Sequence, residues 1–208
     1  MAKYSKKILD TLMKFYPEIK CALNFESPWQ LLVATVLSAQ CTDERVNKVT
    51  VALFAKYPNV ENYVDIDLTE LEKLIFSTGF YKNKARYIKA AAMKVVDSFQ
   101  GKVPEKMEEL ITIPGVARKT ANVVLSEAYN INEGIAVDTH VKRLSNKLGL
   151  TKHNDPKKIE KDLMAEYDQK DWRNITHVLI THGRKYCLAR KPNCKECPLG
   201  KICPSYKI

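Results

Sequence analysis

Four cysteines near the end of the chain carry the strongest chemical signal in this sequence. They follow the pattern Cys187-x6-Cys194-x2-Cys197-x5-Cys203 and fall within 17 residues. In a reducing compartment, thiols this close together indicate a shared metal centre rather than a disulfide framework. Their types and spacing leave two centres open, an iron–sulfur cluster and a zinc ion, because both accept four thiolates.

Basic residues flank these cysteines, among them Lys191 and Lys195. The whole chain has a net charge of +10 and a pI of about 9.2. An excess of positive charge is the electrostatic signature of a nucleic-acid-binding protein, because it neutralises phosphates. A lysine-rich, solvated surface explains the same charge equally well. The charge therefore favours a polyanionic partner without identifying one.

The elements that must position these residues are predicted to be helices throughout. Ser27 and Gln30 form a capping box ahead of an apolar segment, which predicts a central buried helix. Thr69 and Glu72 predict a second helix start, and residues 84–100 predict a long helix that ends at a glycine. No segment alternates apolar and polar residues over a useful length. The sequence therefore predicts an all-α fold.

Residues 105–130 predict a second chemical feature, in which a short helix and a longer helix are joined by a tight turn. Pro114 and Gly115 stop the first helix, and Arg118 begins the second. The free amides at the start of the second helix suit a phosphate and read no base sequence. An ordinary corner between two helices is the alternative interpretation.

The segment Ile113–Val124 resembles the helix-hairpin-helix motif of the endonuclease III family of DNA glycosylases. Residues 37–43, residues 136–141 and the cysteine spacing match the same family in the same order. The resemblance extends from about residue 20 to residue 204. It implies a two-lobed fold, with residues 22–131 as a helical lobe that contains the hairpin. Residues 1–21 and 132–208 would form the other lobe, which carries a [4Fe–4S] cluster in a C-terminal loop.

The resemblance also implies the catalytic residues. Lys119 matches the lysine whose amine attacks the sugar C1′, expels the base and leaves a Schiff base that permits β-elimination. Asp138 matches the family's catalytic carboxylate, which stabilises positive charge on the sugar and accepts protons. Asp138 also precedes a helix, so an N-cap role is equally open. The implied enzyme is a DNA glycosylase and abasic-site lyase that acts on oxidised pyrimidines.

Base removal from a duplex requires the base to leave the stack. By resemblance, Gln40 enters the vacated space and Phe80 matches an intercalating leucine, although Phe80 could instead be a core residue after a helix end. Ala117 replaces a second glycine of the family's hairpin, so either its φ is negative or the hairpin is altered. The other residues expected to contact DNA are Gly115, Arg118, His140, Lys191 and Lys195.

Other functions remain open from the sequence. A glycosylase of the same fold for mismatched thymine or altered purines is the first alternative. A non-catalytic iron–sulfur DNA-binding protein and a redox-sensing iron–sulfur protein are the others. The expected partner is double-stranded DNA that contains damaged bases or abasic sites, bound by a monomer. The N-terminus lacks a signal peptide's apolar core, so we expect the chain in the reducing cytoplasm. The family resemblance implies a nucleoid-associated protein of a prokaryote.

Overall fold

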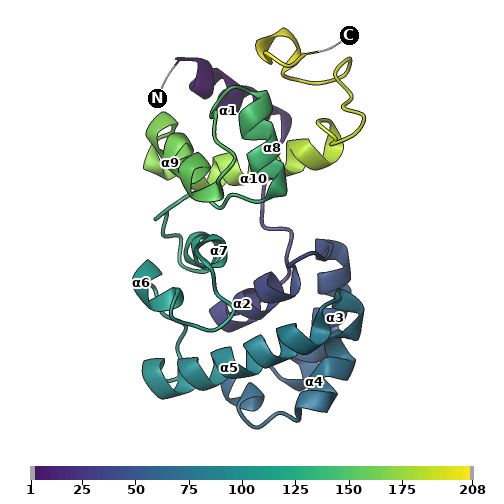
Figure 1. The fold of residues 1–208 in the computed structure, drawn as a ribbon, viewed down its shortest axis with the longest axis vertical. Helices are drawn as coiled ribbons and strands as arrows, with labels where there is room; N and C mark the ends of the chain where they lie inside the picture. The colour runs from purple at the N-terminus through teal and green to yellow at the C-terminus, as the bar shows by residue number, and fades with distance from the viewer. Residues whose placement is uncertain (1–2, 207–208) are drawn as a thin grey trace. The chain divides into compact units, whose positions relative to one another are not determined.

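The computed structural model describes residues 3–206, which form helices joined by turns and loops with no β-strand (Figure 1). The prediction of an all-α fold is therefore confirmed. The chain divides into two compact units, each with its own apolar core. Unit 1 is built from the chain up to Lys20 and from Asn132 onward, and unit 2 is Cys21–Ile131. None of the helices described combines the length and hydropathy needed to cross a lipid bilayer.

Unit 2 is organised around one fully enclosed helix, α2. All of its residues after the first are buried, as expected for a helix that is apolar on every side. Helices α5 and α7 both pack against it. The helices of this unit are α2 (Pro28–Leu37), α3 (Asp43–Lys56), α4 (Leu68–Ile75), α5 (Tyr81–Phe99), α6 (Met107–Leu110) and α7 (Arg118–Ala128), with 3₁₀ turns η1 (Val60–Tyr63) and η2 (Phe76–Thr78).

The N-terminus of α2 is capped as the sequence predicts. The Ser27 hydroxyl accepts the amide of Gln30 at 3.3 Å. The Gln30 side chain accepts a hydrogen bond from the amide of Glu26 at 2.8 Å. In a standard capping box the donor would be the amide of the N-cap residue, Ser27. The start of the buried helix is thus fixed by short-range hydrogen bonds.

The predicted capping box at Thr69 and Glu72 is wrong. Helix α4 begins two residues earlier, where the Asp67 carboxylate accepts the amide of Glu70 at 2.9 Å. Aspartate caps helices better than threonine, and its negative charge also complements the helix dipole. Thr69 is consequently inside the first turn of the helix.

The predicted helix over residues 84–100 begins earlier than expected, at Tyr81, and ends at Phe99. Phe80 precedes it in a left-handed conformation, with φ +49°. Gln100 follows it in the same conformation. Both ends of this helix are therefore set by a flanking residue in the left-handed conformation, and the N-cap residue makes no side-chain hydrogen bond.

Unit 1 is a packed group of helices from both ends of the chain, followed by an extended loop. Helix α10 packs against α1 and α8. After α10, residues 186–206 contain only η4 as a helical turn (Figure 1). The helices of this unit are α1 (Lys3–Phe15), α8 (Thr139–Lys147), α9 (Pro156–Glu166) and α10 (Trp172–Lys185), with 3₁₀ turns η3 (Gln169–Asp171) and η4 (Gly200–Ile202).

Helices α8 and α10 approach closely because α10 has a glycine at their contact. A Cβ at Gly183 would lie 2.8 Å from His140 Nδ1 and 3.0 Å from an Arg143 guanidinium nitrogen. No side chain fits at those distances. Gly183 thereby lets the polar face of α8 lie directly against the end of α10 that leads into the cysteine loop.

Candidate functional site

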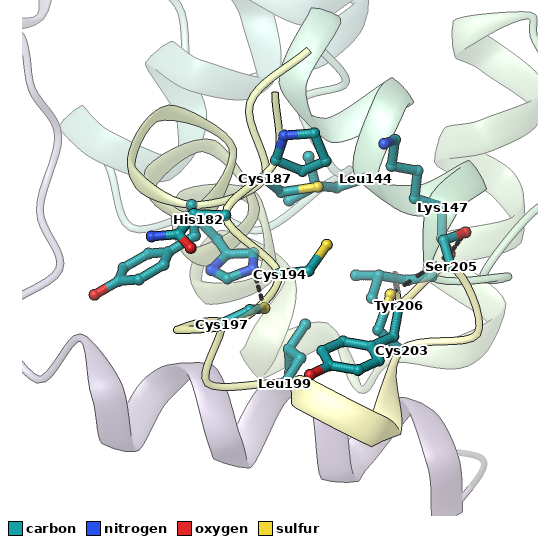
Figure 2. Close-up of a pocket in the computed structure, with 14 residues that line it drawn as sticks. Leu144, Lys147, His182, Cys187, Cys194, Cys197, Leu199, Cys203, Ser205 and Tyr206 are labelled. Carbon is teal, nitrogen blue, oxygen red and sulfur yellow. Dashed lines mark hydrogen bonds between the residues drawn. The ribbon is translucent and has the colours of Figure 1, made fainter. Parts of the chain in front are cut away.

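The four C-terminal cysteines line one pocket in unit 1 (Figure 2). Cys187 follows the end of α10, Cys194 and Cys197 lie in the loop after it, and Cys203 follows η4. Their sulfur atoms surround a common space. Leu144, Leu148 and Leu199 supply apolar wall. All four thiols are half-buried and unbonded to one another. The structure therefore brings together the whole set that the sequence singled out.

Hydrogen bonds from α8 fix both ends of this cysteine loop. The Arg143 guanidinium donates to the carbonyl oxygens of Gly183 and Cys187, at 3.0 Å and 2.9 Å. The Ser205 hydroxyl donates to the carbonyl oxygen of Lys147 at 2.8 Å. Helix α8 thus holds the first and last cysteines of the set near one another. Arg143 was not predicted as a functional residue, because nothing local in the sequence marks it.

A buried histidine contacts the cysteine pocket from its inner side. His182 Nε2 lies 3.4 Å from the sulfur of Cys197, and its Nδ1 lies 3.0 Å from the Tyr16 hydroxyl. Burial lowers the pKa of His182 to about 4, so the ring is neutral near neutral pH. A neutral imidazole offers one N–H donor, which either the tyrosine or the sulfur receives.

The charge state of the cysteines is balanced between burial and neighbouring cations. Burial raises the pKa of Cys187 and of Cys203, because a thiolate is poorly solvated in the pocket. The ammonium of Lys147 acts in the opposite direction on both, and Arg143 does so on Cys187. Four thiolates need compensating charge of this kind. The donor set and its surroundings thus fit a thiolate-ligated centre.

The hairpin of unit 2 has the tight turn that the sequence predicts. Gly115 has φ +81°, and a Cβ there would meet the Cβ of Tyr87 at 2.9 Å. The amide of Val116 donates to the carbonyl oxygen of Ile113 at 3.0 Å, which closes the turn. Both the conformation and the close approach of α5 require glycine at this position.

Ala117 is the N-cap residue of α7, with φ −87°. This negative φ resolves the question raised by the missing second glycine, because alanine adopts it without strain. Its side chain makes no capping hydrogen bond, and the first turn of α7 contains no acidic residue. The first amides of the helix consequently receive no hydrogen bond from the N-cap side chain, and the positive end of the helix dipole is not neutralised by an acidic residue of the first turn.

Arg118 and Lys119 are the first two residues of α7, and both side chains are half-buried. The next two residues, Thr120 and Ala121, are buried in the core of unit 2. The backbone that carries Lys119 is therefore anchored by its neighbours. This arrangement presents an amine on a fixed helix end, as a positioned nucleophile requires.

Asp138 is the N-cap of α8 in unit 1. Its Oδ1 accepts the amide of Val141 at 2.7 Å. The three residues before it, Ile135 to Val137, are buried and anchor the segment that leads to it. The capping role that was open from the sequence is thus present. Only one carboxylate oxygen takes part in the cap, so the other is available for chemistry.

His140 lies in the first turn of α8 and is half-buried. Its Nδ1 is 3.2 Å from an Arg143 guanidinium nitrogen. Burial lowers its pKa most, Asp138 raises it, and the cations Arg143 and Arg184 lower it further. His140 is therefore linked through Arg143 to the cysteine loop. Asp138, His140 and the cysteines belong to one connected region of unit 1, whereas Lys119 belongs to unit 2.

Gln40 and Phe80 lie on two separate loops of unit 2, and both are exposed in left-handed conformations, with φ +54° and +49°. The side chain of Phe80 is 64% exposed, which excludes the alternative that it is a core residue. A left-handed backbone at an aromatic residue is an unfavourable conformation that surrounding structure must enforce. Lys191 and Lys195 are exposed on the cysteine loop of unit 1.

Lys84 is a second residue that the sequence analysis missed. It is 4% exposed and donates from Nζ to the carbonyl oxygens of Leu37 and Thr78, each at 2.8 Å. A signal was present in the sequence, because Lys84 falls on the apolar stripe that continues through Ile88 and Ala91. A charged residue at a core position of a helix needs an explanation.

Comparison with known proteins places this geometry among DNA repair enzymes. Residues 33–169 match the HhH-GPD superfamily of base excision DNA repair proteins. Endonuclease III of Synechocystis is 58% identical over 96% of this chain and 91% of its own length. Endonuclease III of Bacillus subtilis is 44% identical over 94% of this chain and 89% of its own length.

A solved structure has the same fold. A trapped covalent intermediate of an endonuclease III with DNA superposes with a TM-score of 0.92, at 43% identity. The match covers 99% of this chain and 97% of that one. The similarity in both sequence and structure therefore extends over both units.

Proposed function

The chain belongs to the HhH-GPD superfamily of base excision DNA repair proteins and within it to the endonuclease III family, and we propose a bifunctional DNA glycosylase and abasic-site lyase specific for oxidised pyrimidines. The observation that carries this proposal is Lys119 at the start of α7. It follows a hairpin whose helix end has no side-chain cap, so an amine lies beside a site suited to a phosphate.

In the proposed reaction, the Lys119 amine attacks the sugar C1′ and the bond from C1′ to the base breaks. The departing base takes the bond's electrons and, by way of Asp138, a proton from the amine. The bond from C1′ to the ring oxygen O4′ then breaks, O4′ takes a proton from solvent, and the nitrogen lone pair forms a protonated imine of the opened sugar. Loss of a C2′ proton then expels the 3′ phosphate. The free oxygen of the Asp138 carboxylate stabilises the cationic sugar and receives the proton from the amine.

We propose that the hairpin, through Gly115, Ala117 and Arg118, holds a backbone phosphate of the damaged strand. Three observations support this role: the φ of Gly115, the negative φ of Ala117 and the uncapped start of α7. Gln40 and Phe80 enter the duplex where the base leaves. His140, Lys191 and Lys195 contact further phosphates from unit 1.

We propose that the four cysteines hold a [4Fe–4S] cluster. A zinc ion also accepts four thiolates, but zinc sites more often pair two short Cys-x-x-Cys knuckles. This chain has one such pair, Cys194 and Cys197, with longer arms on both sides. Its similarity to endonuclease III proteins supports the cluster, in which each thiolate binds a different iron. When bound, it cross-links the loop that carries Lys191 and Lys195.

Borohydride trapping tests the proposed function directly. The unmodified protein should form a stable adduct with a duplex that contains an oxidised pyrimidine, because reduction converts the imine to an amine. Lys119→Gln should bind the same duplex but lose trapping and strand cleavage. Lys94→Gln, which changes a half-buried lysine of the same unit, is the control and should retain both. Trapping by Lys119→Gln at the parent level would show that the nucleophile lies elsewhere.

Substrate specificity is tested with duplexes that each carry one defined lesion. Base release and strand cleavage are scored separately on oxidised pyrimidines, on thymine opposite guanine and on altered purines. We expect both activities on oxidised pyrimidines. Preferred release of mismatched thymine or an altered purine would replace the proposed substrate while leaving the reaction unchanged.

Asp138→Asn separates catalysis from helix capping. Asparagine caps a helix about as well as aspartate, so the melting temperature should change little. Turnover should fall by about 10²–10⁴-fold, because an amide neither accepts the proton nor balances the sugar's charge. Asp138→Ala should lose both the cap and the activity. We expect the protein to act as a monomer on nucleoid DNA in a prokaryotic cytoplasm.

A further inference from the structure

Lys84 is a buried charge that the proposed chemistry does not use. It lies in the first turn of α5, where the helix dipole disfavours a cation. Burial lowers its pKa, and the neighbouring Cys41 thiol raises it in part. A lysine kept at such a position requires strong compensating contacts. These contacts lead to the two loops that carry Gln40 and Phe80.

The first contact is with the end of α2, from which the Gln40 loop begins. In a continued α-helix the amide of Cys41 would donate to the carbonyl oxygen of Leu37. It donates instead to the carbonyl oxygen of Ser38, at 3.1 Å. The carbonyl oxygen of Leu37 instead accepts the Lys84 ammonium at 2.8 Å. A cation at a helix C-terminus is favourable, because it meets the negative end of the dipole.

The second contact is with the Phe80 loop, which Lys84 holds from two sides. Its ammonium donates to the carbonyl oxygen of Thr78 at 2.8 Å, two residues before Phe80. Its backbone amide donates to the carbonyl oxygen of Phe80 itself at 3.1 Å. Gly79, with φ +71°, lies between the two accepting residues. Lys84 therefore bonds to the carbonyls on both sides of Gly79, through its side chain to Thr78 and through the first helical hydrogen bond of α5 to Phe80.

We propose that Lys84 is a positioning residue that sets the loops of Gln40 and Phe80 at a fixed separation, so that both side chains enter the duplex as one unit. This inference rests on the proposed function, since it concerns how that enzyme extrudes a base. Both loops belong to unit 2, and one ammonium joins carbonyls 41 residues apart in sequence. Two residues in left-handed conformations need such external support to remain in place.

The same helix supplies a matched control. Lys89 lies one turn and a half further along α5 and donates from Nζ to the carbonyl oxygen of Ile66 at 2.8 Å. Its bond has the same length and the same chemistry, but it leads to the segment before α4. Lys89→Met therefore reports the cost of losing a lysine-to-carbonyl bond without disturbing either inserting loop.

The test compares Lys84→Met, Lys84→Arg and Lys89→Met with the unmodified protein. In single-turnover assays, Lys84→Met should slow base release from a paired lesion by about 10-fold to 100-fold, because a misplacement of about 1 Å has such effects. Strand cleavage at a preformed abasic site should fall by less than about threefold, since little extrusion is needed there. Lys84→Arg should recover part of the loss, and Lys89→Met should match the parent.

A second readout observes insertion without chemistry. In the Lys119→Gln background, fluorescence of 2-aminopurine placed opposite a stable abasic analogue reports occupation of the gap. Lys84→Met should lose most of the signal change, and Lys89→Met should keep it. The inference would be overturned if Lys84→Met lost base release and abasic-site cleavage to the same extent. It would also be overturned if the fluorescence change of Lys84→Met equalled that of Lys89→Met.

Two further outcomes are informative. If Lys84→Met does not fold, Gln40→Ala, Phe80→Ala and their combination are measured with Lys84 intact. Loops held as one unit should give non-additive losses of base release, whereas additive losses would contradict the proposal. If the unmodified protein itself forms no trapped adduct, the proposed function fails. If the unmodified protein forms the trapped adduct but Lys84→Met behaves like it in base release and fluorescence, only the positioning role of Lys84 is rejected.

Discussion

The hairpin of unit 2 and the cysteine loop of unit 1 are both expected to meet phosphates, but they are built in opposite ways. The hairpin, from α6 to α7, buries Leu110, Ile113, Val116, Val124 and Leu125 in the core. The cysteine loop, residues 186–206, buries only Leu199 to a comparable degree. Hydrophobic packing thus fixes the hairpin, whereas the loop depends on a few polar contacts and on ligation of its thiols.

This difference implies that the two surfaces respond to different perturbations. A hairpin fixed by its core is sensitive to changes in backbone geometry and packing. A loop held by ligands and by Arg143 is sensitive to loss of iron and of single hydrogen bonds.

Removal of one ligand should have the largest effect. Cys194→Ser should abolish iron binding and cost unit 1 on the order of 5 kcal/mol or more, because binding of a structural metal contributes to folding. Proteolysis should cut within residues 186–206, while amide exchange in the hairpin stays as in the parent. Cys21→Ser, which lies outside the pocket, should retain iron. A loop that stays protected without iron would remove the contrast between the two regions.

Gly115→Ala should be the largest perturbation of the hairpin. Its φ of +81° and the 2.9 Å approach of the Tyr87 Cβ leave no room for a methyl group. We expect a loss of about 3 kcal/mol, measured by chemical denaturation, with iron content unchanged. Ala117→Gly is the control and should be close to neutral, because its φ is −87° and glycine is an acceptable N-cap. Iron loss on Gly115→Ala would show that the regions are not independent.

Arg143→Met should loosen the cysteine loop without removing a ligand. It leaves the carbonyl oxygens of Gly183 and Cys187 without this donor, which should cost about 2 kcal/mol. Iron should dissociate faster in the presence of a chelator, and the hairpin should remain unchanged. Arg86→Met, at an exposed position of α5, is the control. If Arg143→Met retained iron as well as Arg86→Met does, contacts other than those of Arg143 would anchor the loop.

Charge reversal on the cysteine loop should have the smallest effect on the protein itself. Lys191→Glu with Lys195→Glu should weaken binding to undamaged duplex DNA and reduce the salt dependence by about one counterion per lost contact. Stability and iron content should not change. Lys157→Glu with Lys161→Glu on α9 alters the net charge equally and is the control. If both double variants lost affinity equally, the loop would contribute to DNA binding only through the net charge of the protein.

Structural features with local determinants were predicted correctly from the sequence. Ser27 capping α2, glycine at the hairpin turn and the helix that follows Asp138 all depend on residues within a few positions of one another. The errors have local causes too. Asp67 competes with Thr69 for the start of α4, and the left-handed Phe80 moves the start of α5 to Tyr81.

The residues that were missed are those whose partners are distant in sequence. Lys84 bonds to Leu37, 47 positions earlier, and Arg143 bonds to Cys187, 44 positions later. No periodicity or capping rule encodes such pairs, because packing of whole helices determines which carbonyls face which side chains. The exposure of Phe80 and the negative φ of Ala117 likewise required coordinates.

Residue types at short spacings predicted the helical class, the thiolate donor set and the hairpin, because backbone geometry leaves few choices over a few residues. The candidate nucleophile Lys119 was implied instead by the resemblance of residues 113–124 to the endonuclease III family. The folded chain was needed to show that the four cysteines line one pocket, that Arg143 and Lys84 tie separate segments together, and that Asp138 caps α8 with one oxygen. Such contacts join residues far apart in sequence, and they form only after hydrophobic burial has brought the segments together.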